Sequence, residues 1–392
     1  MNAIGARHWN IAETHRVAKR KTETGDKLVN NYRLLQTLGQ GRFGKVKLCQ
    51  RLVNSGTSSS SGAVGSIAAV GVVSAANSEE AGGDVVSLPP PAFGSPKARL
   101  FAMKIFSKKT LRRLKDYCAE PATPQSGEND EEDAVPMRMR AVTALDRVHD
   151  EIEIMRSLYH RNIVLLFEVI EADDSDKVYM VLEYMACGPC MVYRPDTKDF
   201  YSRATGGTLS EELARSYLSD IFFGLQYLHQ RGICHRDIKP DNVLLNDTGR
   251  CHITDFGCAK AFGNGSYTNE SARVSDTVGT YQFLAPECCS GEGYDPFKVD
   301  IWAVGVVLFI FLFGRLPFAS ESTRELFDEI IRAQIVLPTL EESGRELPFS
   351  PEVQDLLRRL LQKDPEQRIT IVQALGHPWF AQDDEEEEPL SF

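Results

Sequence analysis

The chain has 392 residues, 42% of them hydrophobic and 25% charged, which is enough apolar material to bury a core in one large or two coupled lobes. Its formal net charge is −11, and two acidic runs, Glu128–Asp133 and Asp383–Glu388, account for the whole excess. We interpret both runs as solvated, disordered segments, with a specific docking role as the alternative. Because the sequence has no basic stripe, it argues against a nucleic-acid-binding protein.

The sequence also argues against secretion and membrane insertion. The N-terminal residues are polar and lack the apolar stretch of a secretory signal. The longest apolar run, Ile301–Phe313, is too short to span a bilayer and predicts a buried helix. Nine cysteines without a secretory context indicate free thiols in a reducing compartment. We therefore expect a cytoplasmic protein.

The predicted elements change from strands to helices along the chain. Strand-like runs begin at Tyr32, resume at Arg99–Phe106, and recur at Ile163–Ile170 and Val178–Tyr184. A helix is predicted over Leu145–Leu158, because its apolar residues recur every three or four positions. Helices dominate the second half. The pattern predicts an α+β fold with two lobes, a small antiparallel β-sheet lobe with one helix and a larger, mostly helical lobe.

Two blocks of biased composition interrupt the small lobe and are expected to be disordered insertions. Such loops cost little, because closure entropy grows only with the logarithm of their length. The predicted segments are an N-terminal extension (1–30), a small lobe (31–183) with disordered insertions at about 54–96 and 116–141, a large lobe (184–380) and an acidic tail (381–392).

A glycine-rich run, GQGRFGKV, occupies Gly39–Val46. The GxGxxG pattern alone is a weak signal, because in dinucleotide-binding proteins the third glycine opens a helix. Here Lys45–Cys49 continues as a strand, so we predict a hairpin whose backbone N–H groups close over phosphates. An ordinary glycine turn is the other interpretation. On the third predicted strand, Lys104 becomes functional only with a carboxylate partner, and Glu151 on the following helix is the candidate.

The most specific motif is HRDIKPDN at His235–Asn242, followed by DFG at Asp255–Gly257 and APE at Ala285–Glu287. In this order and spacing, the motifs match the catalytic domain of protein kinases. Asp237 would accept the proton of the substrate hydroxyl, which requires a carboxylate within hydrogen-bond reach.

Other residues of these motifs supply the remaining chemistry. Asn242 and Asp255 offer hard oxygen ligands to Mg²⁺. Lys239 can hold the γ-phosphate, and Thr280 would bind both Asp237 and Lys239, which resembles serine/threonine rather than tyrosine kinases. The residues expected to contact ATP are Leu38, Gly39, Gln40, Gly41, Arg42, Phe43, Gly44, Lys45, Val46, Ala102, Lys104, Glu183, Met185 and Leu244.

A CGPC sequence, Cys187–Cys190, follows the predicted hinge and resembles a thioredoxin redox centre. A thioredoxin site needs a helix that begins at the motif and lowers the thiolate pKa, and Pro195 interrupts any such helix. Redox catalysis and a regulatory disulfide remain the alternatives to a plain hinge. Three residues resemble scaffold positions of the kinase family: Glu287 and Arg368 as a buried ion pair, and Asp300 as the anchor of the catalytic loop.

Local features resemble two groups of kinases that activate other kinases. The segment from Glu13 to Gly41 is similar to that of fungal kinases upstream of the AMP-activated (sucrose-nonfermenting) kinase. The run Lys104–Lys109, the insertion after it, and Gly188-Pro189 after the hinge resemble calcium/calmodulin-dependent protein kinase kinases. The resemblance implies activation-loop threonines of downstream kinases as substrates. The insertion is acidic rather than Arg/Pro-rich, and no basic amphipathic helix follows the kinase region, so calmodulin binding is not supported.

One regulatory expectation follows from spacing. Asp276 occupies the position of the activating phosphothreonine of many kinases, and its carboxylate could face Arg236. We hypothesise activity without phosphorylation of this loop, with a solvated loop acid as the alternative; Thr277 and Ser275 are candidate modification sites. We therefore expect an ATP- and Mg²⁺-dependent serine/threonine protein kinase that acts on a protein substrate. The alternatives are a pseudokinase scaffold and a redox protein that uses Cys187 and Cys190.

Overall fold

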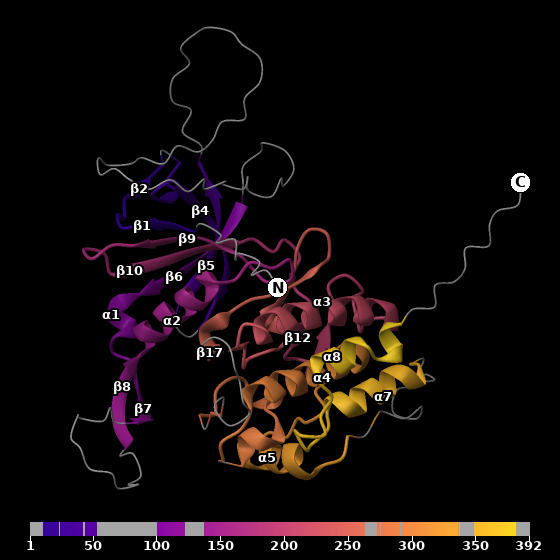
Figure 1. Cartoon of the computed structure of the whole chain (residues 1–392). Coiled ribbons are helices and arrows are strands. Elements are labelled where there is room, and N and C mark those ends of the chain that lie inside the picture. Colours follow the sequence, from indigo (N-terminus) through magenta and orange to yellow (C-terminus); the bar gives the residue numbers. More distant parts are fainter. Residues whose placement is uncertain are drawn as a thin grey trace, which may run out of the picture.

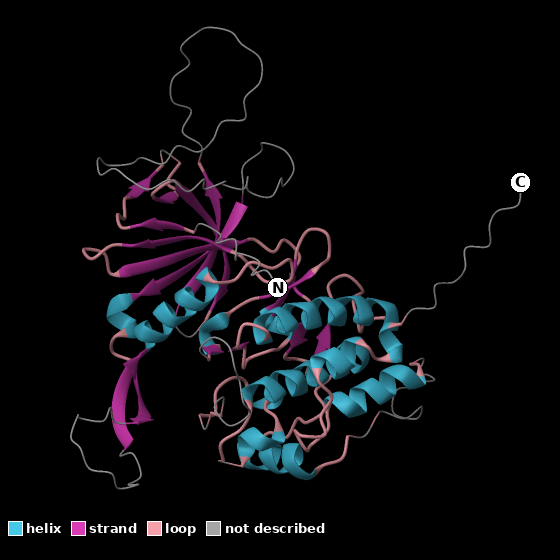
Figure 2. Cartoon of the chain, in the orientation of Figure 1, coloured by secondary structure: helices cyan, strands magenta, loops and turns pink. Residues whose placement is uncertain are grey.

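The computed structural model describes residues 11–22, 24–41, 44–52, 100–121, 137–262, 273–274, 276–290, 292–335, 337 and 349–381. Several sequence predictions fall outside these ranges: Arg42, Phe43, Ser275, both acidic runs and the insertion at about 54–96. Within the described part, the long strands gather in one half of the molecule and most helices lie in the other (Figure 2). This arrangement confirms the predicted α+β fold with two lobes.

The small lobe is built on an eight-stranded sheet in the order β1-β9-β10-β6-β5-β4-β3-β2 (Figure 1). All neighbours are antiparallel except β1 and β9, which are parallel. The strands are β1 (Ala12–Thr14), β2 (Lys19–Lys21), β3 (Lys27–Val29), β4 (Tyr32–Gln40), β5 (Gly44–Arg51), β6 (Leu100–Ser107), β9 (Leu166–Glu171) and β10 (Lys177–Glu183).

Two predicted boundaries are wrong. The N-terminal extension contributes β1–β3 to the sheet, because β1 pairs with β9, and β2 and β3 pair in series with β4. Thr14 of β1 and Tyr32 of β4 also donate hydrogen bonds to the Glu168 carboxylate, at 2.5 and 2.6 Å. The predicted disorder at 116–141 is also incorrect at both ends. Strands β7 (Lys115–Pro121) and β8 (Met137–Thr143) pair there as an antiparallel hairpin.

The helix next to the sheet, α2 (Ala144–Arg156), carries Glu151. Thr143 and Asp146 form a capping box at its N-terminus, which satisfies backbone N–H groups that the helix leaves unpaired. The predicted apolar face, Leu145, Val148, Ile152 and Met155, is buried, and this confirms the helical periodicity. A short helix, α1 (Lys108–Leu111), precedes the hairpin.

The large lobe surrounds α4 (Pro296–Phe313), which is buried on nearly all sides. By length and composition α4 could cross a bilayer, but 83% of it is buried inside the protein, as in the core helix that the sequence predicts. Side-chain caps at Ser210, Asp295, Ser322, Ser350 and Thr370 begin the main helices. The other α-helices of the described residues are α3 (Glu211–His229), α5 (Thr323–Arg332), α7 (Pro351–Leu360) and α8 (Ile371–Leu375).

Short strands and single helical turns complete the large lobe, and Figure 1 labels β12 and β17 among them. The strands are β11 (Gly188–Pro189), β12 (Val192–Arg194), β13 (Asp199–Tyr201), β14 (Ile233–Cys234), β15 (Val243–Leu245), β16 (Cys251–Ile253) and β17 (Lys260–Ala261). The 3₁₀ turns are η1 (Pro240–Asn242), η2 (Phe256–Cys258), η3 (Tyr281–Phe283), η4 (Pro286–Cys289) and η5 (Pro378–Phe380).

Candidate active site

Lys104 lies at the centre of the site, on β6, between Val46 of β5 and Met180 of β10. Its ammonium nitrogen is 2.7 Å from Glu151 Oε1 and 2.8 Å from Asp255 Oδ1. A strand, a helix and the loop before η2 therefore meet at one cation. The carboxylate partner predicted from the sequence is in place, and Asp255 of the DFG motif is a second partner.

Opposing forces set the charge of this cluster. Burial alone would lower the pKa of Lys104, but the nearby carboxylates of Glu151 and Asp255 raise it, so the amine stays protonated. The charge of Lys104 outweighs burial at Asp255 and lowers the pKa of that carboxyl. Burial raises the pKa of Glu151, and Lys104 partly offsets this shift. The cluster thus presents a fixed positive charge with Asp255 ionised beside it.

The glycine-rich run forms a hairpin between β4 and β5 rather than the start of a helix. The Gly41 N–H donates to the Gly44 carbonyl at 2.9 Å, and β5 continues from Gly44. A Cβ on Gly44 would lie 2.5 Å from the carbonyl oxygen of Ile105, so only glycine fits there. This geometry excludes the dinucleotide-binding interpretation, because the helix that it requires is a strand.

The catalytic loop positions Asp237 through both carboxylate oxygens. Oδ2 accepts hydrogen bonds from Lys239 Nζ at 2.7 Å and from Asn242 Nδ2 at 2.9 Å. Oδ1 accepts from the backbone N–H and the hydroxyl of Thr280, at 3.0 and 2.9 Å. Lys239 Nζ also donates to Thr280 Oγ1 at 2.7 Å. The structure therefore brings together the base, the lysine and the threonine that the sequence predicts to act together.

Buried Asp300 of α4 holds the backbone of this loop from below. Its carboxylate accepts the backbone N–H groups of His235 and Arg236 at 2.9 and 2.8 Å, and His229 Nε2 lies 2.8 Å away. Arg236 adopts a left-handed backbone conformation with φ of 64°. Such a conformation is strained for a non-glycine residue and persists where surrounding contacts determine it. Asp300 is thus an anchor of the catalytic loop, as predicted.

The two predicted metal ligands lie at the ends of the paired strands β15 and β16. Asn242 precedes β15 and Asp255 follows β16, and the backbone N–H of Thr254 donates to the Asn242 carbonyl at 3.0 Å. The Asp255 side chain is half exposed, at 49%. One amide and one carboxylate offer hard oxygen donors, which fit a divalent cation that completes its coordination with phosphate and water oxygens. The donor set of this site therefore fits a divalent metal ion.

A family model of the protein kinase domain matches residues 133–380. The chain belongs to the protein kinase family. Its relatives are serine/threonine kinases: ssp1 of Schizosaccharomyces pombe is 34% identical over 94% of this chain and 45% of ssp1. GRIK1 of Arabidopsis thaliana is 30% identical over 98% of this chain and 75% of GRIK1. SNF1-activating kinase 1 of Saccharomyces cerevisiae is 30% identical over 97% of this chain and 30% of its own length. The chain thus spans less than half the length of ssp1 and of SNF1-activating kinase 1.

The hinge of this kinase follows the end of β10 at Glu183. The Glu183 N–H donates to the Leu165 carbonyl at 2.9 Å, and Met185 beyond it is buried. Ala102 and Leu244, from the two lobes, pack against the same apolar cluster as Met185. Leu38 at the end of β4 is exposed. Contact of these residues with adenine stays a prediction, based on the place between the lobes that protein kinases use for ATP.

The CGPC motif does not form a thioredoxin-like centre. Cys187 is exposed, whereas Cys190 is fully buried and its thiol donates to the Pro240 carbonyl at 3.6 Å. Burial raises the pKa of Cys190, and strand β12 rather than a helix follows the motif. Both cysteines are free. The redox interpretation lacks the helix N-terminus that it requires, and burial opposes formation of a Cys190 thiolate.

The predicted ion pair between the APE motif and a late residue is confirmed. Arg368 Nη1 and Nη2 donate to Glu287 Oε1 and Oε2 at 2.6 and 2.9 Å. Sequence reasoning missed Tyr294, whose hydroxyl donates to the Asp276 carbonyl at 2.6 Å. Because Tyr294 lies outside every kinase motif and is separated from Asp276 by the APE segment, no linear pattern identifies this contact.

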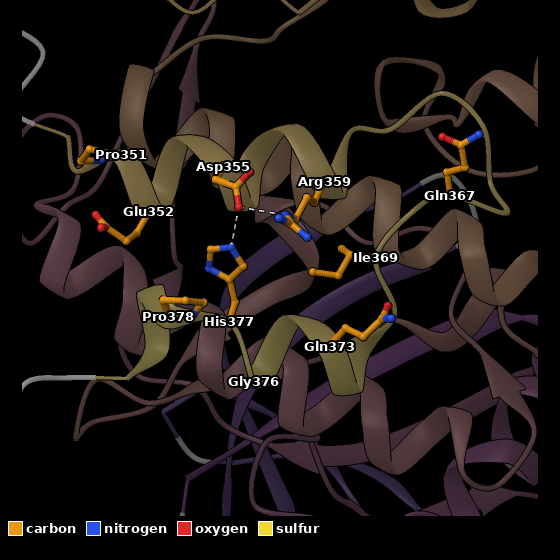
Figure 3. A pocket seen from close by; sticks show the side chains of 10 residues that line it. All are labelled: Pro351, Glu352, Asp355, Arg359, Gln367, Ile369, Gln373, Gly376, His377 and Pro378. Carbon is orange, nitrogen blue, oxygen red and sulfur yellow. Dashed lines mark hydrogen bonds and ion pairs between the residues drawn. The ribbon is translucent and has the colours of Figure 1, made fainter.

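A separate cavity of about 600 Å³ lies between α7 and the C-terminal segment that contains α8 (Figure 3). There the Asp355 carboxylate accepts hydrogen bonds from Arg359 at 2.8 Å and lies 3.0 Å from His377 Nε2. This network joins α7 to η5 and contains none of the catalytic motifs. We interpret it as part of the large-lobe scaffold.

Proposed function

We propose that the chain transfers the γ-phosphoryl group of MgATP to serine or threonine hydroxyls of another protein. The observation that carries this proposal is the single network around Asp237, with Lys239 and Thr280 bonded to its carboxylate and to each other. In that network Asp237 is placed to accept the hydroxyl proton, while Lys239 is placed to neutralise charge on the transferred group.

The groups on the small lobe serve the nucleotide. Lys104, held by Glu151, would bind the α- and β-phosphates, and the hairpin at Gly39–Gly44 would cover the phosphates with backbone N–H groups. Asn242 and Asp255 would hold Mg²⁺, which neutralises charge between the β- and γ-phosphates. A Cβ on Gly39 or Gly41 would meet no atom within 4 Å, so the hairpin leaves open space beside its backbone.

We further propose that the substrate is the activation-loop threonine of a downstream kinase of the AMP-activated or calmodulin-dependent type. Two observations support this narrower proposal. The segment Glu13–Gly41 and the run Lys104–Lys109 resemble kinases that activate other kinases. In addition, the relative from Saccharomyces cerevisiae is named SNF1-activating kinase 1.

The experiment is radiolabel transfer from MgATP by the purified chain, with a kinase-dead AMP-activated-type kinase as recipient. We expect labelling of the recipient's activation-loop threonine, mapped by mass spectrometry, and its complete loss in Asp237→Asn. Labelling at other residues would contradict the substrate proposal but leave the kinase activity. The pseudokinase alternative predicts no transfer to any substrate, including a generic basic protein, and absence of transfer would refute the proposed function.

A further inference from the structure

The described part of the activation segment is joined to the residues that follow the APE motif. Val274 and Tyr294 exchange two backbone hydrogen bonds, at 3.0 and 2.9 Å. Arg273 donates from Nε and Nη2 to the Gly293 carbonyl, at 3.0 and 2.5 Å. This short β-bridge fixes the backbone of Val274, two positions before Asp276.

Asp276 forms a two-point contact with Arg236 of the catalytic loop. Arg236 Nη1 and Nη2 donate to Asp276 Oδ1 and Oδ2 at 2.9 and 3.1 Å. Two parallel N–H···O bonds between a guanidinium and a carboxylate fix orientation as well as distance. The Tyr294 hydroxyl donates to the Asp276 carbonyl at 2.6 Å, so the residue is held at both its side chain and its backbone.

Arg236 connects this contact to the reacting groups. Its side chain is only 8% exposed, its Nε donates to the Cys258 carbonyl after the DFG motif at 2.9 Å, and the next residue is Asp237. A buried guanidinium that loses its carboxylate partner is strongly destabilising. Asp276 therefore neutralises the guanidinium charge of Arg236, a side chain that links the catalytic loop to the residue after the DFG motif.

The chain between Asp276 and Thr280 is held along its length. Thr277 donates from Oγ1 to the Cys288 carbonyl at 3.3 Å. Gly279 has φ of 98°, and a Cβ there would lie 2.6 Å from the Arg236 carbonyl oxygen. Thr280 then reaches Asp237. Displacement of Asp276 would thus be transmitted over four residues to the carboxylate of the catalytic base.

We propose that Asp276, supported by Tyr294, holds the activation segment in its catalytic position without a phosphate group. Many kinases order this segment when a phosphorylated residue pairs with arginine. A phosphate carries a charge of about −1.5 to −2 and three acceptor oxygens, whereas Asp276 offers one charge in a two-point contact. Asp276 and Tyr294 are positioning residues, because they act on Asp237 through Arg236. The inference rests on the proposed kinase function.

The first experiment compares the full chain before and after treatment with a protein phosphatase. Mass spectrometry establishes that the segment 263–281 carries no phosphate after treatment. We expect kcat on a generic protein substrate to stay within about twofold. The charge that orders the segment belongs to the Asp276 carboxylate, which a phosphatase cannot remove. Loss of activity on dephosphorylation would overturn the inference while leaving the kinase function intact. Inactivity in both states would instead refute the proposed function.

The second experiment removes the carboxylate. Asp276→Ala and the isosteric Asp276→Asn should lower kcat of the dephosphorylated enzyme about tenfold, with little change in KM for ATP, since charge-assisted pairs are the strong hydrogen bonds. Asp276→Glu should recover part of the loss. Glu292→Gln is the matched control, because Glu292 is an exposed acid close to the same bridge, and it should change kcat less than twofold. Unchanged kcat in Asp276→Asn would overturn the inference.

A third variant, Tyr294→Phe, tests the backbone support without a change of charge. We expect faster amide hydrogen exchange at residues 276–284 and a kcat loss of about threefold, since a single neutral hydrogen bond is worth less than the ion pair. A purely structural role would lower the melting temperature but leave kcat of the folded enzyme unchanged. That result would remove Tyr294 from the inference.

Discussion

Two ion-pair clusters of this kinase differ in how completely the protein satisfies them. Arg368, with a side chain that is 0% exposed, donates to Glu287 and also to the backbone carbonyls of Gln362 and Lys298, at 3.0 and 2.8 Å. Lys104 contacts two carboxylates, and one of them, Asp255, is 49% exposed. The first cluster is closed by the protein, whereas the second leaves charge open to solvent.

An ion pair between a basic side chain and a carboxylate can therefore serve either stability or ligand binding, according to whether the protein closes it off from solvent. A buried arginine with all its donors used has no capacity for a ligand, and loss of its partner leaves an uncompensated charge in the core. Lys104 instead lies beside the exposed carboxylate of Asp255, so the proposed phosphate binding would require only an exchange of partners. We therefore expect substitutions in the two clusters to separate activity from stability.

The largest effect should come from Lys104→Met. We expect a fall in kcat/KM of roughly 100-fold or more, because the substitution removes preorganised positive charge at the phosphates. Radiolabel transfer measured over a range of MgATP concentrations, from far below KM to saturation, gives this change. Lys47→Met is the matched control on β5, where Lys47 binds Thr37 at 3.1 Å, and it should retain near-full activity. Equal losses in the two variants would contradict the phosphate role of Lys104.

Arg368→Ala tests the closed cluster. We expect a loss of about 3–5 kcal/mol in the free energy of unfolding, because Glu287 remains buried without its partner. Urea denaturation measures this loss, and the specific activity of the folded fraction at low temperature should stay unchanged. Arg359→Ala removes an exposed i,i+4 pair with Asp355 and should cost less than about 1 kcal/mol. Similar costs for both variants would refute the distinction between closed and exposed pairs.

The pair of Arg236 and Asp276 is intermediate between the closed and the exposed ion pairs, because Arg236 is buried and Asp276 is half exposed. Its contribution to stability should depend on pH. Although burial opposes it, the hydrogen bonds from Arg236 lower the pKa of Asp276 below its ordinary value of 3.8. A carboxyl whose pKa is lower in the folded state contributes stability above its unfolded-state pKa, and this contribution disappears as pH falls through the folded-state pKa. The difference in melting temperature between wild type and Asp276→Asn should therefore be constant from about pH 7 to pH 5. It should shrink below about pH 4. A difference that changes between pH 5 and pH 7 would assign the effect to another group.

The smallest effect should come from Cys187→Ser. Its thiol is exposed and free, whereas burial raises the pKa of the Cys190 thiol and so suppresses the thiolate that disulfide exchange requires. Kinase activity should be the same in wild type and variant, with and without a thiol reductant. Reductant-dependent activity that the substitution abolishes would restore the regulatory disulfide as an explanation.

The residues of the candidate active site could be predicted from sequence because the proposed chemistry constrains residue type over short spacings. Asp237 and Asn242 lie in one loop, only five positions apart, and Asn242 donates a hydrogen bond to Asp237. Lys104 and Glu151 are 47 positions apart, yet a strand followed by a helix predicts their pairing. In contrast, β1 is only three residues long and its partner β9 lies more than 150 residues away. A strand this short has no hydrophobic periodicity from which it could be predicted.

The hairpin of β7 and β8 was missed for a related reason. Its composition is polar and mixed, so it resembles the disordered block around it, and its order comes from pairing between the two strands. The ion pair at 2.7 Å between Arg147 of α2 and Asp116 of the hairpin links it to the lobe. Neither interaction leaves a local pattern that sequence analysis can detect.

By itself, the sequence determined which chemical groups this kinase carries and the order in which they occur, because phosphoryl transfer requires particular side chains at particular spacings. Only the tertiary structure showed the surroundings of Asp276 and of the CGPC motif: Asp276 pairs with Arg236, and strand β12 rather than a helix follows the cysteines. A carboxylate or a thiol acquires its charge state from burial and from the partner that the fold places beside it. Arg236 and Tyr294 are 40 and 18 positions away from Asp276 in the chain, and their contacts with it exist only after the chain has folded.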